Sequence, residues 1–174
     1  MPYVAAIRVN AAGDEEVPPY QIPLHLPSSI PRNIRCDKQL EEYEWRLRYA
    51  QANDALDSLR YHLRLESQAL NFKHRFDRGQ SANLKSNDIV KRITNHVRND
   101  TEVYRTARKS LRLMSTSLAK SGWQAVLPIL TDEDVRRMTQ GLPEESEGKR
   151  TLSWIWRTDR VAGDLSDEGL QDGE

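Results

Sequence analysis

Two long stretches of this chain contain neither glycine nor proline and repeat their apolar residues every three or four positions. The first runs from about residue 37 to 76 and the second from about 86 to 118. An average repeat of 3.5 residues gives an α-helix one continuous apolar stripe, and two such stripes bury each other as a coiled-coil seam. Because only a short connector at 78–83 joins them, the helices are predicted to pack antiparallel as a helical hairpin.

Each predicted seam has one polar interruption, Glu66 in the first helix and Asp100 in the second. These residues either fix the register of the hairpin or face solvent where the seam opens. A neighbouring stripe at 40, 43, 47 and 50 predicts a wider buried face at the start of the first helix. The apolar seam positions are Trp45, Tyr49, Ala52, Leu56, Leu59, Leu63 and Leu70, followed by Val90, Ile93, Val97, Tyr104, Ala107, Leu111, Met114 and Leu118.

Two helices alone bury little apolar surface, so a third layer is needed, from this chain or from a partner. The candidates within the chain are the apolar run 122–130, a short helix at 132–140 and the Trp-rich run 151–156. The short helix is predicted because Thr131 and Asp134 have nearly the spacing of a capping box. A serine followed by proline at 28–31 predicts another short helix, which would end near residue 35.

The predicted fold class is therefore all-α, a long antiparallel hairpin with a short additional helix and irregular termini. Residues 1–35 form a Pro-rich extended arm and residues 36–120 the hairpin. Residues 121–157 hold the short helix and the Trp-rich segment, and residues 158–174 form an acidic tail predicted to be disordered. The arm either lies along a helical face or stays flexible.

Several classes of function are disfavoured by composition and spacing. Cys36 is the one cysteine, so an intramolecular disulfide is impossible, and no apolar run has the length of a membrane span. No signal-peptide pattern opens the chain, which favours an intracellular location. No histidine has a second ligand at zinc-site spacing, and no Gly-rich phosphate loop occurs. We therefore expect no catalytic residue, metal, cofactor or small-molecule substrate.

Two further pairs of polar residues are interpreted as structural. His62 is expected to pair with Glu66 on the helix surface, and Asp54 and Asp57 with Arg60 and Arg64. Phe72 and Phe76, four residues apart on one face, are expected to be packing residues.

Charge is distributed unevenly although the formal net charge is zero. Residues 73–112 hold 11 Lys and Arg against 4 Asp and Glu, a net of +7, whereas residues 131–174 hold 6 against 12, a net of −6. Cations at a hairpin tip can contact phosphates, although cations in a last helical turn also favour the helix dipole. The candidates for phosphate contact are Lys73, Arg75, Arg78, Lys85, Lys91 and Arg92.

Five segments resemble, in order, the C-terminal region of fungal KDZ (Kyakuja-Dileera-Zisupton) transposases. They are the proline-bearing run at 26–31, Gln-Ala-Asn-Asp-Ala-Leu-Asp-Ser-Leu-Arg at 51–60, Arg-Gly-Gln-Ser-Ala-Asn at 78–83, and the runs at 132–136 and 148–156. Members of this family are DNA transposases, and their catalysis is attributed to acidic metal ligands in an RNase H-like domain that lies upstream of the region that this chain resembles. The chain contains no strand pattern for such a domain, so no catalytic residue is carried over.

The resemblance implies a non-catalytic, transposase-derived module that contacts DNA through the hairpin tip or mediates subunit association, with a nuclear location. A coiled-coil module that binds a helical partner or a second copy, without a nucleic-acid role, is the alternative.

Overall fold

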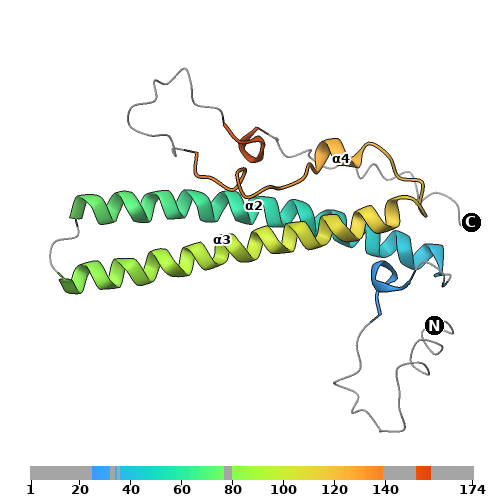
Figure 1. Cartoon of the computed structure of the whole chain (residues 1–174), viewed down its shortest axis with the longest axis horizontal. Helices are drawn as coiled ribbons and strands as arrows, with labels where there is room; N and C mark the ends of the chain where they lie inside the picture. The colour runs from blue at the N-terminus through green and yellow to red at the C-terminus, as the bar shows by residue number, and fades with distance from the viewer. Residues whose placement is uncertain (1–24, 32–33, 35, 77–79, 139–151, 158–174) are drawn as a thin grey trace, which may run out of the picture.

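Two long α-helices, α2 (Lys38–Phe76) and α3 (Gln80–Ser115), form an antiparallel hairpin in the computed structural model (Figure 1). The structure describes residues 25–31, 34, 36–76, 80–138 and 152–157. Around the hairpin lie a short helix, α4 (Trp123–Val126), and two 3-10 helices, η2 (Pro27–Ser29) and η4 (Trp154–Trp156). The predicted all-α hairpin fold is confirmed. Predictions for the arm before residue 25 and for the tail after residue 157 lie outside the described residues.

The start of α2 agrees with the sequence, and the start of α3 does not. Asp37 caps α2, because its Oδ1 accepts a hydrogen bond from the backbone N–H of Gln39 at 2.8 Å. By contrast, α3 begins at Gln80 and not near residue 86, so the predicted start of the second helix is wrong. Leu84 and Lys85 favour helix, and this propensity continues the helix through residues that were expected to form a turn.

The far end of α3 turns back through a hydrogen-bonded cap. The N–H of Lys120 bonds the carbonyl of Ser115 at 3.0 Å, and the N–H of Ala119 bonds the carbonyl of Thr116 at 3.4 Å. Ala119 has a φ of 51°, the left-handed conformation that a Schellman motif requires. The chain therefore reverses direction after residue 118, the predicted end of this helix.

The predicted seam forms the buried core. Leu59, Tyr104, Ala107 and Leu111 have no exposed surface, and Leu56 and Leu63 are almost fully buried. Pairs of residues across the hairpin fix its antiparallel register, because Lys73 meets Asn87 near the tip and His62 meets Asp100 further along. The heptad spacing thus identified the correct face of both helices.

The two polar interruptions of the seam are paired across the hairpin. His62 Nδ1 lies 2.6 Å from Oδ2 of Asp100, and the hydroxyl of Thr94 donates to Glu66 at 2.8 Å. Arg137 adds an ion pair to Glu66 at 3.6 Å. The expected His62–Glu66 pair is therefore wrong, and both interruptions belong to the register-fixing alternative. The expected pairing of Asp57 with Arg60 is present at 2.8 Å.

The wider buried face at the start of α2 is not observed. Tyr43 is 57% exposed and Leu47 70% exposed, and Ala50 is also exposed. The covered flank is instead that of Trp45, whose ring meets Trp123 edge-on at 5.7 Å between centroids. Periodicity identifies a face as apolar but carries no information about which segment covers it.

The third layer of the fold comes from this chain and is held by side chains from the hairpin. Figure 1 shows α4 and the segment after it running along one side of the hairpin. Arg105 donates to the carbonyl of Leu130, Arg108 to that of Leu127 and Tyr104 to that of Pro128, at 3.0, 2.9 and 2.6 Å. Arg60 donates to the carbonyl of Ile155 at 2.5 Å, and Ile155 is fully buried.

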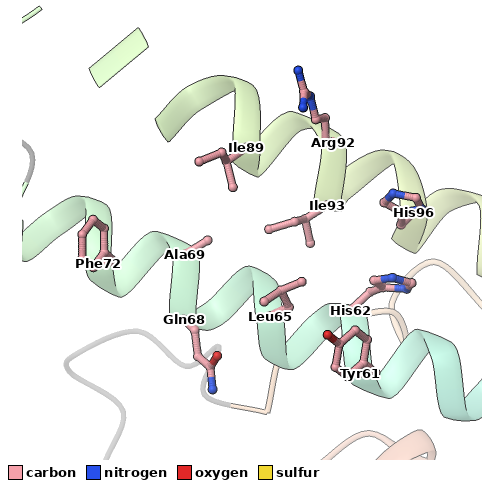
Figure 2. Close-up of a pocket in the computed structure, with 10 residues that line it drawn as sticks. All are labelled: Tyr61, His62, Leu65, Gln68, Ala69, Phe72, Ile89, Arg92, Ile93 and His96. Atoms are coloured by element: carbon pink, nitrogen blue, oxygen red, sulfur yellow. The ribbon is translucent and has the colours of Figure 1, made fainter. Parts of the chain in front are cut away.

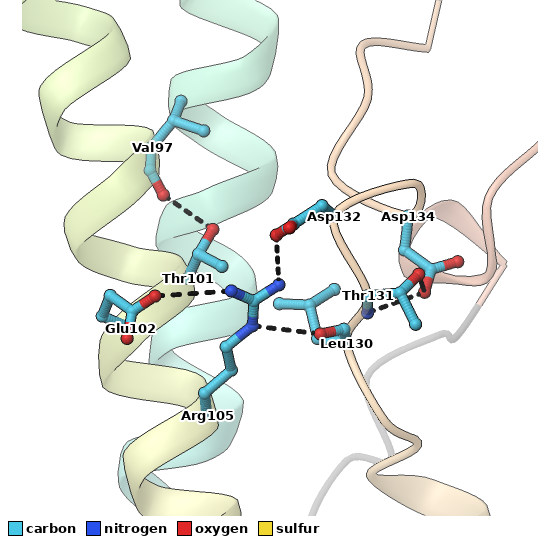
Figure 3. Close-up of polar contacts among 8 residues, drawn as sticks. All are labelled: Val97, Thr101, Glu102, Arg105, Leu130, Thr131, Asp132 and Asp134. Atoms are coloured by element: carbon cyan, nitrogen blue, oxygen red, sulfur yellow. Dashed lines mark hydrogen bonds and ion pairs between the residues drawn. The ribbon is translucent and has the colours of Figure 1, made fainter.

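The helix predicted at 132–140 is absent from its described part, residues 132–138. The expected bond nonetheless forms, because Oδ2 of Asp134 accepts from both the N–H and the hydroxyl of Thr131, at 3.0 and 2.6 Å (Figure 3). Arg105 donates to the carbonyl of Leu130 at 3.0 Å and to the carboxylate of Asp132 at 2.6 Å, the residues on either side of Thr131. These contacts hold the chain against α3 in an irregular path.

The short helix predicted from residue 28 is also wrong. Pro27–Ser29 form a single 3-10 turn, and residues 30, 31 and 34 are not helical. Ser28 binds the buried carboxylate of Glu44 with both its N–H and its hydroxyl, at 2.8 and 2.6 Å, and Arg48 adds an ion pair to Glu44 at 3.2 Å. A buried carboxylate is tolerated only when it is hydrogen-bonded or ion-paired in this way. Ser28 therefore satisfies the carboxylate of Glu44 and does not cap a helix.

Shortening a seam residue should destabilise the protein far more than shortening an exposed residue of the same helix. Leu111→Ala is expected to lower the free energy of unfolding by about 2–5 kcal/mol, because it opens a cavity in a fully buried site. Leu84→Ala is the control, since Leu84 is 66% exposed on α3. This substitution should change the free energy of unfolding by less than about 0.5 kcal/mol. Urea denaturation followed by circular dichroism measures both, and equal effects would contradict the seam.

Arg105 should anchor the third layer through the shape of its guanidinium group. Arg105→Lys removes the fork that reaches Leu130, Asp132 and Glu102 together (Figure 3), and is expected to cost about 1 kcal/mol. Limited proteolysis should then cut residues 123–138 faster. The control is Arg112→Lys on the exposed face of α3, and equal cleavage rates in the two variants would count against this role.

Candidate nucleic-acid interface

The free end of the hairpin carries most of the predicted phosphate-contacting residues, and we call this region the basic tip. Among the described residues of 67–99 there are six Lys and Arg and one acidic residue, Asp88, a net of +5. Arg78 lies outside the described residues. The other five predicted cations, together with Arg98, make up the described part of the basic tip. The cations are Lys73 and Arg75 on α2, and Lys85, Lys91, Arg92 and Arg98 on α3.

The cations of the basic tip surround it and do not share one flat face. Lys85 and Arg92 are seven residues apart on one flank of α3, and Lys91 and Arg98 are seven apart on another. Seven residues make two helical turns, about 10.5 Å, close to three 3.4 Å steps of one DNA strand. Lys73 is half-buried and donates to Oδ1 of Asn87 at 2.5 Å. One of the hydrogen-bond donors of its ammonium group is therefore already used within the hairpin.

The basic tip differs from the rest of the molecule in how few carboxylates accompany its cations. Among the described residues, none of the six forms an ion pair. Several arginines elsewhere are engaged, as Arg48 is with Glu44, Arg60 with Asp57 and Arg105 with Asp132. Lys38, Lys109 and Arg112 form no ion pair with a described residue either, but they lie apart from the basic tip. Positive charge at the tip is therefore not neutralised by side chains of the described part of the chain.

A shallow groove runs between the two helices beside the basic tip (Figure 2). Leu65 and Ala69 of α2 and Ile89 and Ile93 of α3 point into the space between the helices. Arg92 lies on the outer edge of the groove, and His62 and His96 stack at 4.9 Å between ring centroids at one end. The floor of this groove is apolar and one of its borders is cationic.

Phe72 was expected to be a packing residue, but it is 59% exposed and lines the groove. The side chain of Phe76 lies outside the described residues. The sequence did not predict the groove, because Leu65, Ala69 and Ile89 of its lining belong to neither predicted seam and were given no role. A usable signal existed: Tyr61, Leu65 and Phe72 fall on a stripe of α2 distinct from the seam.

The remaining polar groups offer little for covalent or metal chemistry. No group of three His, Cys, Asp or Glu residues that could hold a metal ion occurs within the described residues. Burial raises the pKa of Tyr104, whose hydroxyl donates to the carbonyl of Pro128 and so serves structure. Burial of Asp134 acts to raise the pKa of its carboxyl, but hydrogen bonds, chiefly from Thr131 and also from Trp154 and Ser153, outweigh it and hold that pKa below its usual range.

Comparison with known proteins gives no relative: no family model, no curated protein and no solved structure matches the chain. The motif resemblance to KDZ transposases therefore stays a prediction. In the part of the chain that the structure describes, no helix combines the length and the apolar character that a membrane span requires.

Cys36 should be a slow nucleophile in the folded protein. Burial is the larger cause that raises the pKa of its thiol, and the negative charge of Glu41 adds to it. Because the thiolate is the reactive form, the rate of iodoacetamide alkylation should rise with pH along a curve displaced to higher pH in the folded protein. Mass spectrometry of the native protein and of the same protein in urea measures the two curves, and coincident curves would contradict the burial effect.

Proposed function

We propose that this protein is a non-catalytic helical module that contacts nucleic acid through the basic tip. The single observation that carries the proposal is the concentration of six cations against one acidic residue, Asp88, among the described residues of 67–99, the half of the hairpin that ends at the tip. None of the six forms an ion pair with a described residue. Cations left unpaired are available to replace the counterions of a polyanion, and release of those ions drives binding.

The shape of the tip supports contact with the phosphate backbone and not with bases. A helical hairpin projects its end away from the rest of the protein (Figure 1), so a duplex can approach the tip without meeting the third layer. The side chains of Lys85, Lys91, Arg92 and Arg98 are exposed on more than one flank of α3. Phosphate contacts of this kind position a protein on nucleic acid without reading its sequence, so binding should be largely independent of sequence.

The motif resemblance gives this proposal a biological setting. A helical region of a DNA transposase would act on DNA, and its place of action would be the nucleus. The proposal does not need this setting, because the charge pattern of the tip carries it alone.

Neutralising exposed cations of the tip should weaken DNA binding, whereas neutralising equally exposed cations elsewhere should not. The test variant is Lys85→Gln/Lys91→Gln/Arg92→Gln, and the control is Lys38→Gln/Lys109→Gln/Arg112→Gln, with the same change of net charge. The test variant should lose at least about tenfold in affinity for a random-sequence duplex. The slope of log K against log salt should also become less negative by up to about 2.7, because each of the three lost phosphate contacts contributes roughly 0.9 to that slope.

Fluorescence anisotropy with a labelled 20-base-pair duplex measures both quantities at several salt concentrations. Extending the test variant with Lys73→Gln, Arg75→Gln and Arg78→Gln should remove most of the remaining salt dependence. Equal losses in the test and control variants, or no binding by the unmodified protein at low salt, would refute the proposal.

A further inference from the structure

Three exposed aromatic rings line the groove beside the basic tip. Tyr61 and Phe72 of α2 are 62% and 59% exposed, and His96 of α3 is exposed as well. All three border the space between the two helices (Figure 2). One exposed ring is ordinary on a protein surface, but three rings along one shallow groove indicate a surface that can receive flat apolar groups.

Both walls of the groove place a cation nearer the tip than the aromatic ring. On α2, Arg75 follows Phe72 by three residues, so the two side chains share a face of the helix. On α3, Lys85, Arg92 and His96 share a face because seven and four residues separate them. A ligand that enters the groove therefore meets positive charge and aromatic surface together.

The inner end of the groove is fixed by the seam of the hairpin. Nδ1 of His62 lies 2.6 Å from Oδ2 of Asp100, which holds the imidazole in place. The ring of His62 stacks on that of His96 at 4.9 Å between centroids, and Tyr61 meets His62 edge-on at 5.3 Å. These rings form a row across the groove that is positioned before any ligand arrives, which lowers the entropic cost of binding.

Cations beside aromatic rings distinguish a single strand of nucleic acid from a duplex. In a duplex the face of each base is covered by its neighbours, so the protein meets mainly phosphates and sugars. In a single strand the bases can stack on protein rings while the phosphates contact Lys and Arg, and proteins that bind single strands combine these two features. Every base has a flat face, so this contact adds affinity without reading the sequence.

The length of the groove fits a short stretch of strand. Tyr61 and Phe72 are 11 residues apart on α2, which corresponds to about 16 Å along the helix axis. Successive stacked nucleotides of one strand are separated by about 3.4 Å. The two rings therefore span roughly five nucleotides.

We propose that this groove binds single-stranded nucleic acid, with bases stacked on Tyr61, Phe72 and His96 and with phosphates on the cations at its border. The inference rests on the proposed function, because the basic tip supplies the attraction to phosphate. It adds that unpaired bases contribute affinity of their own.

Strands with and without bases test the proposal at equal charge. The full chain is titrated into labelled 20-nucleotide strands of oligothymidine, of oligouridine and of abasic sites, and fluorescence anisotropy gives each affinity. At least one base-bearing strand should bind about fivefold or more tightly than the abasic strand, the smallest gain expected from stacking one base. The tighter of the two base-bearing strands identifies DNA or RNA as the ligand.

A matched pair of tyrosine variants locates the effect. Tyr61→Leu should weaken binding of the base-bearing strand several-fold and leave the abasic strand and the salt dependence unchanged, since it removes a ring and no charge. Tyr43→Leu is the control, because Tyr43 is 57% exposed on the same helix and does not line the groove. Tyr61→Leu/Phe72→Leu should remove most of the preference for bases, with helical content checked by circular dichroism.

The outcomes separate this inference from the proposed function. Salt-dependent binding of the abasic strand and of a duplex, with no preference for strands that carry bases, would overturn the inference and leave the proposed function standing. Equal losses in Tyr61→Leu and Tyr43→Leu would also overturn it. Absence of binding to every strand and to the duplex at low salt would overturn both.

Discussion

The 3.5-residue apolar repeat shared by α2 and α3 is the constraint on which the rest of the structure depends. It turns two separate helices into one body, because residues such as Leu59 and Leu111 lose all contact with water only when the helices lie together. The polar members of the seam reinforce this arrangement. Asp100 and Glu66 find partners across the hairpin, and such pairing is satisfied only in one register. Every other segment is positioned relative to that frame.

The repeat was readable from the sequence, and so the fold class and the buried face of both helices were predicted correctly. What failed were inferences about which distant segment of the chain lies against a side chain. The stripe that begins at Tyr43 and Leu47 has the spacing of a core, yet it is exposed because the third layer lies on another flank. Thr131 and Asp134 make the bond typical of a helix start, yet no helix follows because Arg105 holds the flanking residues.

The candidate interface was predictable to a similar extent. The concentration of cations near the turn is a property of the sequence, and the five of the six predicted residues that the structure describes lie in the half of the hairpin that ends at its tip. Their lack of ion pairs within the described residues was not readable, since it depends on where carboxylates such as Asp57 and Asp132 lie in space. The groove was equally hidden, because it is formed by two helices together and by neither alone.

The way the third layer is attached has a consequence for how this protein can change. Hydrogen bonds from Arg60, Tyr104, Arg105 and Arg108 reach main-chain oxygens of residues 127–130 and 155. Every amino acid offers that oxygen, so these bonds survive substitution at the receiving positions, whereas loss of a donor on the hairpin removes an attachment point altogether. Tolerance to mutation should therefore be uneven. The bonded oxygens place no demand on the side chains that carry them, so Leu127, Leu130 and Ile155 need only stay apolar because they are buried. The few long donor side chains on the two helices are held fixed.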